Sequence, residues 1–67
     1  MDEEQLNQQI RKFLKKVGIN AQRELERALR SADESGALDR KAPLPVTMHL
    51  SLPAIGLEVD IDDELNL

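Results

Sequence analysis

Apolar residues in the first quarter of the chain recur at the spacing of one face of an α-helix. Five of them fall on one stripe of the helix surface: Leu6, Ile10, Phe13, Leu14 and Val17. This spacing predicts a helix from about residue 3 to residue 17. Gly18 follows directly, and glycine readily adopts the left-handed conformation that ends a helix.

A second segment with helical spacing begins immediately afterwards. Its apolar members are Ala21, Leu25, Ala28, Leu29 and Ala32. Asn20 is a favoured N-cap residue and Gly36 a favoured helix end, so the pattern predicts a second helix from about residue 21 to residue 35. Because three of the five apolar residues are alanine, we expect the two helices to pack closely together.

The period of the pattern changes to two after residue 45. Pro43 and Pro45 hold the preceding linker, residues 37–45, in an extended conformation. Beyond it, apolar and polar residues alternate. This alternation predicts strands at about residues 46–52 and 57–62, each with one apolar face.

Four residues separate the two strands, and Pro53 and Gly56 suit the first and last positions of a four-residue hairpin loop. The apolar pairs across the hairpin are then Leu52 with Leu57, Leu50 with Val59, and Met48 with Ile61. A three-residue loop would instead pair Leu52 with Glu58 and bring carboxylates to the apolar face, so we reject it.

The apolar face of the hairpin needs a cover, since an isolated two-stranded hairpin is marginally stable in water. The two helices are the only cover available. The sequence therefore predicts one α+β domain, residues 1–67, of order ααββ, with a helical hairpin packed on one face of a two-stranded antiparallel β-hairpin. The other face should be wet, and the unpaired hairpin edge would allow a homodimer to form edge to edge.

The charges are unevenly distributed along the chain. The formal net charge is −4, but every lysine and arginine lies at or before Lys41, and the residues after it carry five carboxylates and no base. No cysteine is present for a disulfide or a thiolate metal site. Because no apolar run approaches the roughly 20 residues of a membrane-spanning helix, we expect a cytoplasmic protein without membrane contact.

His49 is the only histidine, and the register places it opposite Asp60. A catalytic pair would also need a nucleophile and an oxyanion site in a concave pocket, which the open face of a two-stranded sheet does not provide. The acids between Glu58 and Glu64 are too widely spaced for calcium, since alternate strand residues lie about 6.8 Å apart. We therefore expect no enzyme activity, no metal and no cofactor.

Basic side chains lie opposite the apolar stripes of both predicted helices. They are Arg23, Arg27 and Arg30 in the second helix and Lys12 and Lys15 in the first. Two helices with outward arginines followed by a hairpin resemble in outline a winged helix-turn-helix. The third helix is missing, however, and the wing would be acidic where phosphate contact requires bases. With one phenylalanine and no tyrosine or tryptophan, the chain also has little means of stacking bases.

The run from Ile10 to Leu25, IRKFLKKVGINAQREL, with the proline-containing linker and the acidic C-terminal segment, resembles a family of short bacterial proteins of unknown function. This resemblance implies no activity, cofactor or partner.

The leading hypothesis is a small noncatalytic protein–protein interaction module. It would associate with itself or with another protein through the sheet edge or an incompletely covered apolar surface. The alternative is a nucleic-acid-associated module that uses Arg23, Arg27 and Arg30. An enzyme is a distant third.

Overall fold

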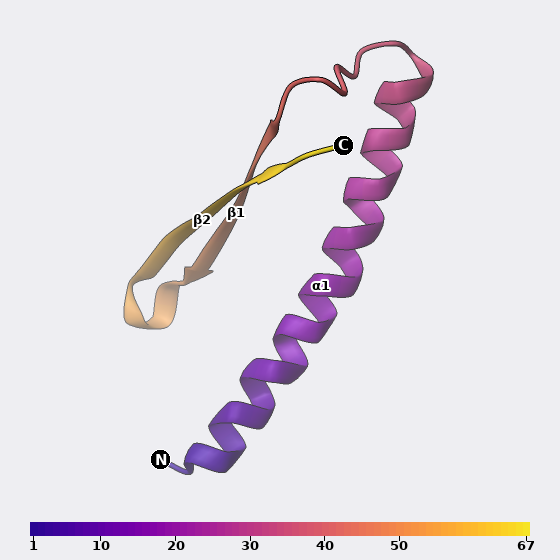
Figure 1. Ribbon diagram of the computed structural model, residues 1–67. Coiled ribbons are helices and arrows are strands. Elements are labelled where there is room, and N and C mark those ends of the chain that lie inside the picture. Colours follow the sequence, from indigo (N-terminus) through magenta and orange to yellow (C-terminus); the bar gives the residue numbers. More distant parts are fainter.

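The computed structural model describes residues 1–67 and contains one long helix and one β-hairpin (Figure 1). Helix α1 spans Glu3–Glu34. After a linker, strand β1 spans Leu44–Leu52, the short 3-10 helix η1 spans Pro53–Ile55, and strand β2 spans Leu57–Leu65. The predicted α+β class is confirmed. The predicted ααββ order with a helical hairpin is wrong, because there is only one helix before the strands.

The expected break between two helices does not occur, because α1 continues through residues 18–20. Gly18 does not adopt the positive φ that would end a helix. Asn20 does not cap a new helix either. Its side-chain Nδ2 donates to the backbone carbonyl oxygen of Lys16 at 2.8 Å, one turn earlier in the same helix.

The phase of the apolar stripe explains why the helix continues. Val17 and Ala21 are four residues apart, so the stripe passes the glycine without leaving its face of the helix. A glycine inside a helix costs only about 1 kcal/mol relative to alanine. The unbroken stripe therefore carries more weight than the two residues that resemble a helix end and a helix start.

Both ends of α1 are capped, and the helix end predicted at Gly36 is confirmed. A carboxylate oxygen of Asp2 accepts hydrogen bonds from two backbone N–H groups of the first turn, at 3.0 and 3.3 Å. At the other end Gly36 has a φ of 75° and donates to the Asp33 carbonyl oxygen at 3.2 Å. The N–H of Ala37 donates to the Ala32 carbonyl oxygen at 2.9 Å, which completes a Schellman motif.

We expect Gly18→Ala to stabilise the protein. Gly18 is exposed in the middle of the helix, and a Cβ there would meet nothing within 4 Å. Alanine should raise the free energy of unfolding by about 0.5 to 1 kcal/mol, measured by urea unfolding. Gly36→Ala is the control, because a φ of +75° is strained for a residue with a Cβ and stability should fall. A loss of stability in both variants would contradict a continuous helix.

The predicted strand register is confirmed. The apolar pairs are Leu52 with Leu57, Leu50 with Val59, and Met48 with Ile61. The strands are longer than expected, since they begin at Leu44 and end at Leu65. Gly56 has a φ of 68° and its N–H donates to the Pro53 carbonyl oxygen at 3.1 Å, so the four-residue loop forms as predicted.

The chain has no buried core, since none of its residues is buried. A helix of 32 residues is about 48 Å long, whereas a nine-residue strand is about 30 Å long, so the hairpin lies beside only part of α1 (Figure 1). The radius of gyration is 15.9 Å, against about 11 Å for a compact chain of this length. The predicted helical hairpin would have placed two helices on the apolar face of the hairpin. One straight helix cannot place both of its halves there, so part of that face stays uncovered.

Candidate interaction surface

An apolar groove lies between the first half of α1 and the turn end of the hairpin. We define it by the apolar side chains that line it: Ile10, Phe13, Leu14, Leu50, Leu52 and Leu57. The helical residues reach it because they share the stripe of α1, and the strand residues because alternate side chains of a strand point to one face. Phe13 and Leu14 are still 52% and 54% exposed, so the hairpin covers them only in part.

Apolar surface continues along the hairpin beyond the groove. Met48, Val59 and Ile61 belong to the same face and are 42%, 40% and 57% exposed. Met48 also shares a shallow depression with Val17 and Ala21 of α1. The prediction that helices cover this face is therefore only partly confirmed, because one helix is present where two were expected.

The opposite face of the hairpin is wet, as predicted, and its polar side chains pair across the strands. The hydroxyl groups of Thr47 and Ser51 donate to the carboxylates of Asp62 and Glu58, each at 2.8 Å. His49 Nδ1 lies 2.7 Å from a carboxylate oxygen of Asp60, which confirms that these two residues face each other. Because all these groups are exposed, each pair contributes at most about 1 kcal/mol to stability.

His49 contacts a second carboxylate, since its Nε2 lies 2.8 Å from Glu58 Oε2. Both ring nitrogens are thus occupied by acidic side chains. Glu58 also accepts the hydroxyl hydrogen of Ser51 and stands between that hydroxyl and the imidazole. No group of three or more histidine or acidic side chains is arranged to hold a metal ion.

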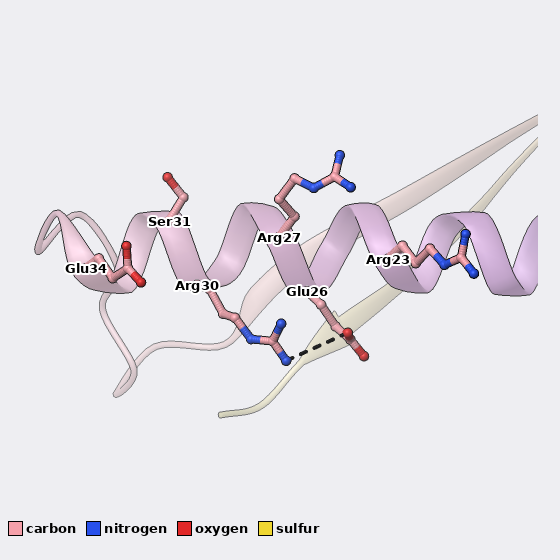
Figure 2. A pocket seen from close by; sticks show the side chains of 6 residues that line it. All are labelled: Arg23, Glu26, Arg27, Arg30, Ser31 and Glu34. Carbon is pink, nitrogen blue, oxygen red and sulfur yellow. Dashed lines mark ion pairs between the residues drawn. The ribbon is translucent and has the colours of Figure 1, made fainter.

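The basic residues singled out in the sequence lie along the outer side of one helix, which we call the cationic face. They are Lys12, Lys15, Arg23, Arg27 and Arg30. Because α1 is continuous, the two lysines and the three arginines form one row on a single helix. Figure 2 shows the arginines extending outwards from α1 with Glu26 among them.

Two arginines of the cationic face are already paired with carboxylates. Arg27 lies 3.3 Å from Glu24, and Arg30 lies 3.8 Å from Glu26. Arg23 has no acidic partner within 4 Å. The acids on this side of α1 reduce the positive potential that the row presents.

No helix of the structure has the length and the hydropathy required to cross a bilayer.

The sequence suggested an incompletely covered apolar surface as a contact site but did not identify the residues of the apolar groove, because they have the spacing of core positions. The available signal was length. An unbroken helix of 32 residues is longer than either strand can cover, so part of its stripe has to remain uncovered. Reading that signal required knowing that Gly18 does not end the helix.

Comparison with known proteins adds a family and no function. The model of the family of unknown function DUF6494 matches residues 1–67. No curated protein and no solved structure matches the chain. The resemblance noted between Ile10 and Leu25 therefore extends over the whole sequence.

Proposed function

Because this chain belongs to a family of unknown function, its surface has to indicate its role, and we propose that it is a noncatalytic protein–protein interaction module. One observation carries the proposal: none of the residues is buried although 40% of them are hydrophobic. Apolar side chains stabilise a structure when they leave water. Here the helix and the hairpin place them on a shared face, and a partner surface is needed to bury them.

The surroundings of the apolar groove resemble the layout of a protein interface. Its centre is apolar and includes the single phenylalanine, Phe13. Lys16, Asn20 and Glu24 lie beside it, where Met48 approaches α1. An apolar centre with a polar border is typical of surfaces that bind proteins, because the centre supplies the stabilisation and the border stays hydrated.

The noncatalytic part of the proposal is supported by the surroundings of His49. An imidazole that activates a hydroxyl has to contact it, but here Glu58 separates the ring from Ser51. The site also lies on the open face of a two-stranded sheet. These features fit a cross-strand pair that stabilises the hairpin.

The test compares binding by the wild-type chain, Phe13→Asp and Ile19→Asp. Both substitutions replace a large apolar residue of α1 by aspartate, but Ile19 lies about 120° around the helix from Phe13. Each tagged protein is used to retain binding partners. The retained proteins, which can include an untagged copy of the chain, are identified by mass spectrometry. We expect retention by the wild type and Ile19→Asp and loss with Phe13→Asp. Equal retention by the two variants would contradict the proposal.

Nucleic-acid association through Arg23, Arg27 and Arg30 is the second candidate function. Its support is the continuous row of bases on the cationic face. The carboxylates paired with two of the arginines and the acidic strand β2 count against it. A titration with duplex DNA at two salt concentrations tests this candidate function, because phosphate contacts require affinity to fall steeply as salt rises.

A bacterial source and a cytoplasmic location remain part of the proposal as well.

A further inference from the structure

We propose that the apolar groove is covered by a second copy of this chain, and that the functional unit is a homodimer formed through α1 and the apolar face of the hairpin. The inference rests on the proposed function and names its partner. Of the two contact surfaces that the sequence suggested, it selects the incompletely covered apolar surface over the hairpin edge.

The surface area of the chain supports a dimer of this kind. A compact protein of 7.6 kDa exposes about 4300 Å², whereas this chain exposes 6108 Å². Each copy therefore carries an excess of about 1800 Å², so two copies have about 3600 Å² to bury. That area falls within the range of about 2000 to 5000 Å² that obligate homodimers bury.

The shape of the chain points to a second copy because each copy has what the other lacks. α1 covers only part of the apolar face of the hairpin, since Met48, Val59 and Ile61 of that face remain exposed. The N-terminal end of α1 extends beyond the turn of the hairpin (Figure 1). The first half of this helix carries apolar residues, among them Leu6 and Ile10. In a two-fold dimer, α1 of one copy takes the place of the missing helix over the hairpin of the other.

The charges also suit a second copy. Between Ile10 and Arg30 the chain has seven bases and two acids, whereas the residues after Lys41 have five acids and no base. With the apolar stripe of α1 over the apolar face of the partner's hairpin, the cationic face of α1 and the carboxylates of Glu58, Asp60 and Asp62 both point outwards and stay hydrated. The contact therefore presses no like-charged faces together, and the burial of apolar area meets little electrostatic opposition.

Pairing through the hairpin edge is less favourable on the same grounds. Two β2 strands side by side would bring the carboxylates of Glu58, Asp60 and Asp62 together, and like charges opposite each other destabilise a sheet. Pairing of two β1 strands is weakened by Pro45, which has no N–H to donate to a neighbouring strand. Edge pairing would also leave the apolar groove exposed.

The experiment is sedimentation equilibrium of the full chain and its two aspartate variants. We expect the wild type and Ile19→Asp to have twice the mass of the chain. Phe13→Asp should raise the dissociation constant at least about 100-fold, because the dimer buries this position twice. Circular dichroism checks that each variant retains its helix. Dimers of equal strength in Phe13→Asp and the wild type would overturn the proposal.

A second measurement needs no variant and keeps the proposal testable if Phe13→Asp does not fold. In a mixture of isotope-labelled and unlabelled wild-type chains, filtered NOE spectra report contacts between copies only. We expect contacts from the Phe13 ring to leucine methyl groups of the other copy. Contacts confined to the strand edges around Thr47 and Ser51 would overturn the inference.

A monomeric wild type separates the failure of this inference from the failure of the proposed function. A monomer that binds the apolar dye ANS, with the binding lost in Phe13→Asp, would rule out the second copy and leave the groove as a site for a different protein. A monomer that binds no dye would rule out both. A monomer that binds anionic lipid vesicles would show that the apolar stripe serves a membrane surface instead.

Discussion

Ala21→Pro should destabilise the protein by at least about 3 kcal/mol. Ala21 lies in the interior of α1, where its N–H donates to the carbonyl oxygen of Val17 one turn earlier. Proline removes that donor, and its ring clashes with the same carbonyl group. In two separate helices, Ala21 would instead be the first residue after the Asn20 cap, a position that proline favours. The substitution therefore distinguishes one helix from two.

Glu3→Pro is the matched control for this prediction. Glu3 is the first residue of α1, and the cap formed by Asp2 uses the N–H groups of Glu4 and Gln5 instead. Proline there should change the free energy of unfolding by less than about 0.5 kcal/mol. Urea unfolding followed by circular dichroism, at one fixed protein concentration, compares the two variants. If Ala21→Pro is as stable as Glu3→Pro, the continuous helix is wrong.

Leu50→Asn should reduce the free energy of unfolding by about 2 kcal/mol. Leu50 is half-buried at the centre of β1, opposite Val59, and lines the apolar groove. The substitution removes apolar burial worth about 1 kcal/mol for a half-buried leucine and places an amide against apolar side chains. The same urea unfolding experiment measures the loss.

Ser51→Asn introduces the same side chain one residue later. Ser51 is exposed and its hydroxyl donates to Glu58 on the wet face of the hairpin. Because the amide of asparagine remains hydrated there and can also donate, stability should stay within about 0.5 kcal/mol of the wild type. Similar losses in both variants would show that the two faces of the hairpin do not differ, which would remove the basis of the apolar groove.

The hairpin and the apolar groove differ in how far the sequence could reveal them. Local chemistry determines the turn, since Pro53 and Gly56 restrict the loop, and the alternation of apolar residues permits only one register. The groove depends on residues more than thirty positions apart, such as Phe13 and Leu50. Each has the spacing of a core residue, and a local pattern does not show whether a distant segment packs against it.

The sequence predicted which residues form the cationic face. It did not predict that they lie on one continuous helix. Helical spacing places Arg23, Arg27 and Arg30 opposite the apolar stripe, and the structure agrees. The ion pair between Glu26 and Arg30 also follows from their spacing of four residues. Lys12 and Lys15, in the first half of α1, continue the same row only because Gly18 remains inside the helix.

The sequence by itself determined both ends of α1, the turn, the strand register and the identity of the two hairpin faces, because each depends on neighbouring residues or on a strict period. Only the tertiary structure decided that the helix runs unbroken past Gly18 and Asn20 and how much of the hairpin it covers. Gly18 and Asn20 disfavour a continuous helix by only small differences in free energy. The phase of the whole apolar stripe therefore decides the outcome. The resulting rod is longer than the hairpin, and its excess length leaves the apolar face open.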